Sequence, residues 1–240
     1  MGFISLKDVR KVYHVGTEKI VALGRINIEI GRGEICCILG TSGSGKSTLL
    51  NIMAGLEKLS RGTVTIAKTD VTDFGEKKWA LFRQRNIGFV FQSYGLLPSL
   101  TALENVALPL TFMGIGKNER IKRAAHMLKA VGLKDRMLHK PTQMSGGQQQ
   151  RVGIARAFVS HPKIIFADEP TGNLDSKTSN EVMGIMVSMA EKYGETLVVV
   201  THDLEIAKYA QRIITIHDGD VVGDEKNSGI QRKFEEEKAV

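Results

Sequence analysis

The chain has 240 residues, 42% of them hydrophobic and 25% charged, which are ordinary values for a folded protein of one domain or one domain with an inserted lobe. Its net charge of +7 comes from basic residues spread along the chain without interleaved aromatic residues, so we expect no nucleic-acid partner. The sequence lacks a signal peptide and any apolar run near the roughly 18 residues that span a bilayer, so we expect a cytoplasmic chain without direct membrane insertion.

The first elements along the chain are β-rich. Segments that alternate or contain many β-branched residues predict an antiparallel β subdomain near the N-terminus, with strands at 3–13, 26–30 and 62–67. The apolar run at 34–40 contains the adjacent cysteines Cys36 and Cys37. Neighbouring cysteines in one strand suit neither an ordinary disulfide nor a metal pair, so they are interpreted as small core residues in a reducing compartment.

The next segment, GTSGSGKST, matches the pattern G-x-x-x-x-G-K-[ST]. A predicted strand precedes it and a helical apolar spacing follows it, an arrangement that turns backbone N–H groups and a helix N-terminus towards a phosphate. Lys46 can reach the terminal phosphates, and Ser47 is placed to bind Mg²⁺. The segment predicts a nucleotide site formed by Gly40, Thr41, Ser42, Gly43, Ser44, Gly45, Lys46, Ser47 and Thr48.

Four short runs are too apolar for strands with one wet face and predict a parallel sheet that is covered on both sides, at 34–40, 86–92, 163–169 and 196–202. Each run ends in a glycine or polar residue: Gly40, Gln92, Asp168 with Glu169, and His202. Ligands of open α/β sheets bind beyond the carboxyl ends of the strands, so these residues are expected to converge on one site. There Asp168 suits Mg²⁺ binding, and Glu169 suits orienting or deprotonating a water molecule.

Helices are predicted between the second and third of these strands, at 101–110, at 118–131 and from about Ser145. They form a predicted helical lobe, 93–158, inserted into a core made of 1–92 and 159–225. A hairpin is expected near the end of the core, with Asp218-Gly219 as its turn. The last residues, 226–240, are predicted to be a charged tail.

The segment MSGGQQQR is a second glycine-rich turn at a helix start. Ser145 can cap the helix while Gln148 reaches back, as in a capping box. Gly146 and Gly147 are poor helix residues, and their position in the first turn favours close approach of a phosphate to the backbone. The chain has one loop of this lysine-containing type, GTSGSGKST (the lysine loop), and one acidic pair, Asp168 with Glu169. The second turn is therefore expected to complete a site in another copy.

GTSGSGKST, IIFADE and SGGQ together make the chain resemble the ATP-binding subunits of the ATP-binding-cassette (ABC) transporters over roughly residues 3–222. The resemblance implies an α/β fold, with a P-loop NTPase (RecA-like) core, a mainly parallel sheet, an N-terminal antiparallel β subdomain and an inserted helical subdomain. It also implies an ATPase that uses ATP and Mg²⁺, dimerises head-to-tail with a second copy and drives a separate integral membrane permease. The chain would then lie on the inner face of the cell membrane.

The same resemblance implies roles for single residues. Gln92 would be the hinge glutamine that contacts Mg²⁺, Glu169 the catalytic base, and His202 the histidine at the γ-phosphate. Asp175, in the segment GNLD, matches the loop that links the two sites of a dimer. Tyr13 falls where an aromatic ring stacks on adenine, although a tyrosine that ends a strand is as often a core residue.

The order of motifs is similar to the branch that contains lipoprotein-release, macrolide-efflux and related peptide-resistance systems, which implies export or force transmission. The segment SGGQ corresponds to the family signature, which usually begins with a leucine before these residues, whereas this chain has Met144, a residue of similar volume. The alternative is a cell-envelope or signalling ATPase of division type that moves no solute, because its ATP chemistry would be identical. The sequence leaves the transported substrate open.

A membrane partner needs a docking surface, and the sequence predicts it in the segment SYGLLPSL directly after Gln92. The segment carries exposed apolar candidates in a region where a loop is normally polar: Tyr94, Leu96, Leu97 and Leu100. Packing of these side chains inside the helical lobe is the alternative.

Overall fold

The structure is a computed structural model that describes residues 2–227. Its larger sheet has the strand order β10-β9-β3-β8-β7-β6, and its smaller sheet has the order β2-β1-β4-β5. The strands are β1 (Ile4–Val15), β2 (Glu18–Ile30), β3 (Ile35–Leu39), β4 (Arg61–Ile66), β5 (Thr69–Asp70), β6 (Ile87–Phe91), β7 (Ile164–Asp168), β8 (Thr196–Thr201), β9 (Arg212–His217) and β10 (Asp220–Lys226).

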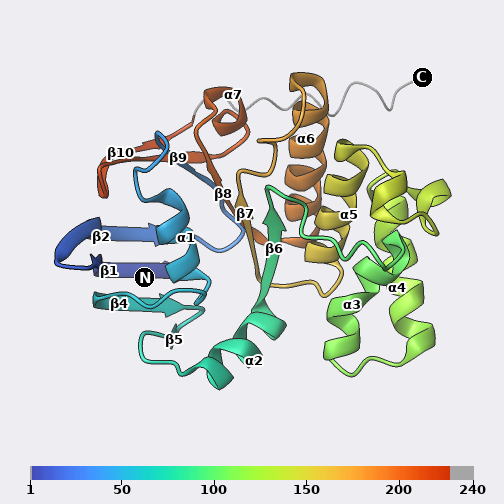
Figure 1. Cartoon of the computed structure of the whole chain (residues 1–240), viewed down its shortest axis with the longest axis horizontal. Coiled ribbons are helices and arrows are strands. Elements are labelled where there is room, and N and C mark those ends of the chain that lie inside the picture. Colours follow the sequence, from blue (N-terminus) through green and yellow to red (C-terminus); the bar gives the residue numbers. More distant parts are fainter. Residues whose placement is uncertain (1, 228–240) are drawn as a thin grey trace.

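Helices cover the larger sheet. They are α1 (Lys46–Met53), α2 (Glu76–Asn86), α3 (Ala102–Phe112), α4 (Lys117–Ala130), α5 (Gly146–Phe158), α6 (Ser176–Tyr193) and α7 (Leu204–Ala207), with short 3-10 turns at Lys134–Arg136 and Pro141–Gln143. The small sheet and α1 pack on one side of the large sheet, and α3 to α6 pack on the other (Figure 1). Within residues 2–227, no helix combines the length and apolarity needed to cross a membrane.

The four apolar runs form β3, β6, β7 and β8, and these strands pair in parallel as predicted. Successive side chains of a strand point to opposite faces, and here both faces are covered. Cys36 packs with α1 and the small sheet, whereas Cys37 packs with the helices on the other side. Both cysteines are buried free thiols, and burial raises the pKa of Cys37 to about 12, so they are core residues as the sequence indicated.

The predicted antiparallel β subdomain is the small sheet, in which β1 pairs with β2 and β4. The strand β2 begins at Glu18, well before the predicted start, because β1 and β2 stay paired up to the turn at Gly16, where φ is 61°. The predicted hairpin joins β9 and β10. Its turn residues Asp218 and Gly219 both have positive φ, as a type I′ turn requires.

The three helices predicted between β6 and β7 are α3, α4 and α5. Capping boxes fix the starts of two of them: Thr101 caps α3 and Ser145 caps α5. The turn after α4 contains Gly132 at a φ of 74°, a left-handed conformation that glycine adopts at helix ends. Local capping chemistry therefore sets the limits of this helical region.

Two long helices, α2 and α6, were not predicted from the sequence. In α2 only Trp79 is buried, so the helix has almost no apolar stripe to recognise. The division into a core, 1–92 with 159–225, and a helical lobe, 93–158, stays a prediction. Of the predicted tail, 226–240, the structure describes Lys226, which ends β10, and residue 227; the others lie outside the described residues.

Candidate nucleotide-binding site

The loop between β3 and α1 contains the predicted phosphate-binding segment. Gly45 has a φ of 100°, and a Cβ there would lie 2.5 Å from the carbonyl oxygen of Ala22, so only glycine fits. Gly43 also has positive φ, 80°, and a Cβ there would meet no atom within 4 Å. Among the described residues, no side chain caps α1 and its first turn contains no acid. The loop and the first N–H groups of the helix therefore fit a phosphate.

A cavity of about 720 Å³ lies beside this loop. Its lining comes from the ends of β3, β6, β7 and β8, from the loop, and from one residue each of α7 and β9: Leu39, Gly40, Thr41, Ser42, Gly43, Lys46, Ser47, Gln92, Glu169, His202, Leu204 and Thr215. Ser44, Gly45 and Thr48 belong to the loop and first helical turn without lining the cavity. The four strand ends thus meet around one cavity, as parallel strands require.

Lys46 and Ser47 point their polar atoms towards the loop and β7. Lys46 as a whole is almost fully buried, and its ammonium donates to the carbonyl oxygen of Thr41 at 2.7 Å. The Ser47 hydroxyl donates to Oδ1 of Asp168 at 3.1 Å. Burial raises the pKa of Asp168, while this hydrogen bond opposes the shift. A hydroxyl beside a carboxylate supplies the oxygen ligands that Mg²⁺ prefers.

Glu169 follows β7 with a φ of 44°, an uncommon backbone conformation for a non-glycine residue. Two groups hold its carboxylate: Nδ1 of His202 lies 2.9 Å from Oε1, and the Thr201 hydroxyl donates to Oε2 at 3.3 Å. The role of Thr201 was missed from the sequence, although it directly precedes His202 at the end of β8. The carboxylate is thereby aimed by residues from the neighbouring strand.

Gln92 follows β6, and a Cβ on Gly172 would lie 2.8 Å from its side-chain Nε2. Buried Gln150 of α5, which sequence reasoning missed, donates from Nε2 to the carbonyl oxygens of Phe91 and Pro170 at 3.3 and 2.5 Å. It ties the end of β6 to the turn after β7. The run of three glutamines in GGQQQ gave no signal of which one turns inward.

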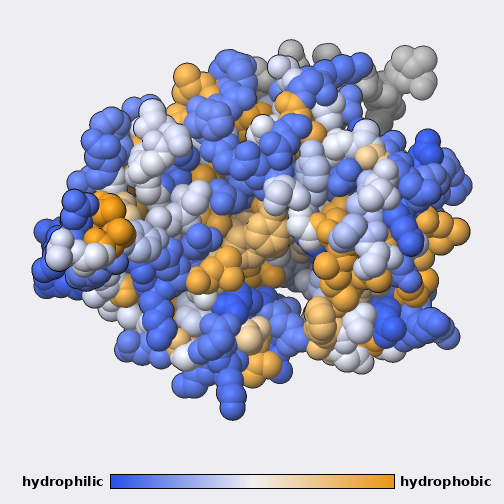
Figure 2. Space-filling view, in the orientation of Figure 1, coloured by the Kyte–Doolittle hydropathy of each residue, from blue (hydrophilic) through white to orange (hydrophobic). Residues whose placement is uncertain are grey.

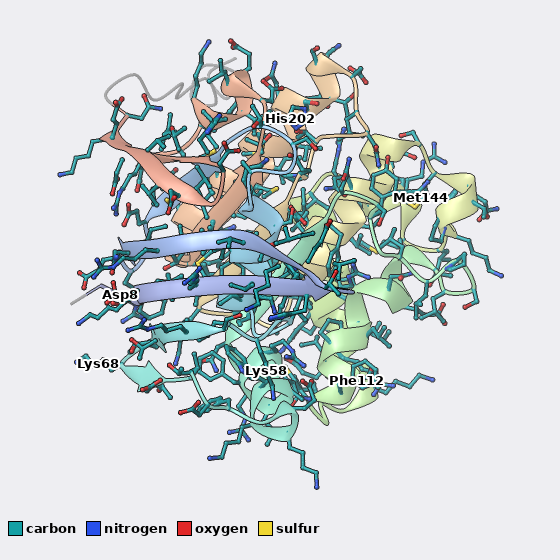
Figure 3. All side chains as sticks on the ribbon, turned by 60° about the vertical axis from the view of Figure 1, so that its left-hand side comes forward. Asp8, Lys58, Lys68, Phe112, Met144 and His202 are labelled. Carbon is teal, nitrogen blue, oxygen red and sulfur yellow. The ribbon has the colours of Figure 1, made fainter. Side chains whose placement is uncertain are left out.

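The signature residues lie outside the cavity of their own chain. Ser145 and Gln148 form the predicted capping box, with distances of 3.3 Å from the Gln148 amide to the Ser145 hydroxyl and 3.1 Å for the return bond. Figure 3 shows Met144, next to this turn, well separated from His202 in the cavity. Within one chain, the signature therefore does not meet the lysine loop.

Close contacts within the chain also require glycine at each of the two glycine positions of the signature. A Cβ on Gly147 would lie 2.4 Å from the Thr178 methyl group on α6. A Cβ on Gly146 would lie 2.7 Å from the Tyr94 hydroxyl. The sequence attributed both glycines to a nearby phosphate, but close contact of α5 with α6 and with Tyr94 also requires them.

Tyr13 and Asp175 have local partners. The Tyr13 hydroxyl lies 3.4 Å from that of Thr48, and the Lys11 ammonium covers one ring face at 4.7 Å from its centre. Tyr13 lies within β1 rather than at its end. Asp175 caps α6 by accepting from Thr178, and these hydrogen bonds lower the pKa of Asp175. Adenine stacking by Tyr13 and the linking role of Asp175 stay predictions.

Comparison with known proteins identifies the family. Residues 23–172 match the family described as ABC transporter. The ATP-binding cassette MJ0796 of Methanocaldococcus jannaschii, solved as a dimer bound to ADP and Pi, is 47% identical with a TM-score of 0.87, covering 94% of this chain and 99% of that chain.

Two relatives have more specific names. The lipoprotein-releasing system ATP-binding protein LolD of Legionella pneumophila is 44% identical, covering 92% of this chain and 98% of LolD. The macrolide export ATP-binding/permease protein MacB of Vibrio parahaemolyticus is 42% identical, covering 95% of this chain and 35% of MacB. With the lysine loop, the acidic strand end and the signature turn, these matches show that the chain belongs to the ABC transporter ATP-binding proteins, a family of ATPases that bind ATP with Mg²⁺.

Proposed function

We propose that two copies of the chain bind two ATP molecules head-to-tail and that hydrolysis drives a separate membrane permease, for export or force transmission. The position of the signature supports the dimer, because Ser145 and its turn lie outside the cavity of their own chain. The MJ0796 cassette, a relative, was solved as a dimer. Each site would then combine the lysine loop of one copy with the signature of the other.

Within a composite site, Lys46 binds the terminal phosphates, and Ser47, Gln92 and Asp168 hold Mg²⁺. A Mg²⁺ ion held there would supply positive charge to the phosphate oxygens, which would favour attack on the γ-phosphate. Glu169 orients the attacking water and accepts its proton. The contacts of Thr201 and His202 with its carboxylate support this role, because they aim Glu169 at the cavity.

The surface that would receive the permease is an apolar groove of about 590 Å³ between α2, β6, α3 and α5. Figure 2 shows the hollow between α2 and α3, with hydrophobic residues along it. Leu81 and Phe112 line the groove with 54% and 70% of their surface exposed. Phe91 lines the groove, and the next residue, Gln92, lines the nucleotide cavity. The proposal rests on this adjacency, because a displacement of Phe91 also displaces Gln92, its neighbour in the chain.

The names of two relatives support an outward direction. LolD belongs to a lipoprotein-releasing system, and MacB is a macrolide export protein whose single chain has both ATP-binding and permease functions. LolD is by name the ATP-binding protein of its system and is covered over 98% of its length, which supports our proposal that the permease is a separate chain. The protein would then lie in the cytoplasm, at the inner face of the cell membrane.

Mixed variants test the composite site. Chains with Lys46→Ala and chains with Ser145→Arg should form heterodimers with one intact site and one doubly altered site. The intact site uses the lysine loop of the Ser145→Arg chain, so photo-crosslinked ATP should be found on that chain. ATP found at normal occupancy on the Lys46→Ala chain would show that each chain closes its own site.

A charge placed in the groove tests the coupling. Leu81→Glu should retain basal ATP hydrolysis, as expected for a surface change, and lose stimulation by the co-expressed permease in lipid nanodiscs. Leu138→Glu is the matched control, because Leu138 is 77% exposed and does not line the groove. Equal stimulation of wild type and Leu81→Glu would contradict docking in this groove.

A further inference from the structure

Arg156 of α5 lies in the wall of the apolar groove. Its guanidinium donates from Nη1 to the carbonyl oxygen of Gly95 at 2.5 Å and from Nη2 to that of Tyr94 at 3.0 Å. Burial lowers its pKa, yet an arginine remains charged at any physiological pH. A guanidinium has five N–H donors, so these two contacts leave further donors for a ligand.

The charge of Arg156 is not balanced within residues 2–227, where it forms no ion pair with an acidic side chain. On the same helix, Arg151 pairs with Glu181 at 3.0 Å. In the same groove, Arg83 pairs with Glu76. None of the described residues that line the groove is acidic. A partly buried charge without a counter-ion is costly, so this site favours a negative group from outside the chain.

We propose that the permease segment seated in this groove is an apolar helix that carries one carboxylate side chain, and that this carboxylate binds Arg156. The inference rests on the docking of a permease in the groove, proposed above. The apolar walls take the leucine-like face of the helix, and a planar guanidinium binds a carboxylate through two parallel hydrogen bonds. The carboxylate fixes the register of the helix, which apolar contacts alone leave loose.

The position of Arg156 connects such a carboxylate to the nucleotide site. The two carbonyl groups that Arg156 holds belong to the segment directly after Gln92. The Tyr94 side chain in turn lies against Gly146 of the signature turn. A carboxylate that draws the guanidinium towards the groove therefore also displaces the carbonyl groups of Tyr94 and Gly95. This displacement changes the backbone between Gln92 and the signature turn.

Two fluorescent helical peptides of about 16 residues test the proposal on the full chain. Both carry leucines at i, i+3, i+4 and i+7, and they differ only in a central Glu or Gln. The Glu peptide should bind wild type at least about tenfold more tightly than the Gln peptide, because hydrogen bonds to charged groups are strong. Fluorescence anisotropy at low salt gives both affinities, and the difference should shrink as salt is raised.

Variants assign the difference to one side chain. Arg156→Gln should bind both peptides equally, and Arg156→Lys should retain part of the preference, because lysine keeps the charge but loses the planar fork. Arg151→Gln, on the same helix but outside the groove, should behave as wild type. The melting temperature of each variant shows that it is folded.

The outcomes separate this inference from the function on which it rests. Equal binding of the two peptides to wild type would overturn the proposed carboxylate and leave the groove as a docking site. Failure of both peptides to bind wild type would overturn docking of an apolar helix in the groove, and this inference with it. A preference for Glu that persists in Arg156→Gln would assign the carboxylate to another residue and would also overturn the inference.

Discussion

Asp168 and Glu195 carry carboxyl groups at the ends of the neighbouring parallel strands β7 and β8, but they lie at opposite edges of the larger sheet. Asp168 ends β7 at the edge that carries the nucleotide cavity, where it accepts a hydrogen bond from Ser47. Glu195 precedes β8 at the other edge, where 3% of its surface is exposed. Neither of its carboxylate oxygens has a hydrogen-bond partner in the described chain, and burial raises its pKa to about 8.

The comparison indicates that the position of a carboxyl group in the sheet decides whether it contributes to catalysis or to stability. At the carboxyl edge, the Ser47 hydroxyl contacts Asp168 and the His202 imidazole contacts Glu169, and the charge of Lys46 opposes the rise in the pKa of Asp168, so a charged form can be held there. At the amino edge, Glu195 is buried just after the end of α6, and Nδ1 of His161, whose pKa is lowered by burial, lies 3.8 Å from its Oε1. Changes at the carboxyl edge should therefore alter catalysis, and changes at the amino edge should alter stability.

The largest expected effect is that of Glu169→Gln. Loss of a general base should lower the rate of ATP hydrolysis by about 10²–10⁴-fold while ATP binding is retained. Because ATP then persists between two copies, the variant should elute as an ATP-dependent dimer. Phosphate release and size-exclusion chromatography with ATP measure the two effects.

The same substitution at the other edge, Glu195→Gln, is the matched control for this experiment. Its rate of ATP hydrolysis should stay close to that of wild type, because Glu195 does not line the nucleotide cavity. An active Glu169→Gln enzyme would remove Glu169 from the role of base. An inactive Glu195→Gln enzyme that is well folded would contradict the proposal that changes at the amino edge alter stability and not catalysis.

The second prediction concerns the pH dependence of stability. The pKa of Glu195 is raised from an ordinary 4.5 to about 8 in the folded chain, so the folded state binds the proton more tightly than the unfolded state does. The free energy of unfolding should therefore fall as pH rises from about 5 to about 8. The full shift corresponds to at most roughly 5 kcal/mol, at 1.4 kcal/mol for each pKa unit.

Glu195→Gln should remove this loss, because an amide stays neutral at every pH. The variant should resemble wild type at pH 5 and be more stable by several kcal/mol at pH 8.5, within the limit set by the pKa shift. Urea unfolding at a series of pH values gives the difference between the two proteins and cancels the contributions of other groups. A difference that does not change with pH would show that Glu195 is ionised in the folded chain.

A smaller effect is expected at Gly147 of the signature turn, where α5 packs closely against α6. Gly147→Ala places a methyl group 2.4 Å from the Thr178 methyl and should lower the free energy of unfolding by about 1–3 kcal/mol. Thr178→Ser removes that methyl group and should restore much of the loss in the double variant. Gly153→Ala, on the same helix with its nearest atom at 3.5 Å, should be neutral or stabilising.

Urea unfolding of these variants beside wild type measures the effect on packing, and ATP-dependent dimerisation measures the effect on nucleotide binding between copies. If Gly147→Ala keeps its stability but loses dimerisation, the glycine serves the nucleotide of the partner copy rather than the contact with α6.

The carboxyl edge could be predicted from the sequence because its chemistry requires particular residues in short segments. A glycine loop with lysine and serine, or an acid pair after an apolar strand, can be read without knowing what lies nearby in space. The positions of Thr201 and Gln150 could not be read, because hydroxyl and amide side chains at such places usually have structural partners.

The groove was missed for a different reason. It forms between α2 and α3, which are separated in the sequence by β6 and the loop after it, and α2 has no apolar stripe to indicate the groove. The predicted docking segment, SYGLLPSL, is divided in the structure: Leu96 packs against the core, whereas Leu97 is 44% exposed. Spacing along a loop does not distinguish two neighbouring leucines, so the role of Leu97 in docking stays a prediction.

The smallest expected effect is that of Met144→Leu, which restores the residue that usually begins the signature. Met144 is buried in the same apolar cluster as α3, α4 and α5, and its carbonyl oxygen accepts from the side chain of Gln149 at 3.1 Å. The two residues have similar volumes, so the free energy of unfolding should change by less than about 1.5 kcal/mol. Because the backbone contact does not depend on the side chain, the capping box at Ser145 should keep its geometry, and ATP hydrolysis should stay within about twofold of wild type. Urea unfolding and phosphate release, measured beside Gly147→Ala, check both values. A large loss of hydrolysis without loss of stability would mean that the methionine itself positions the signature turn.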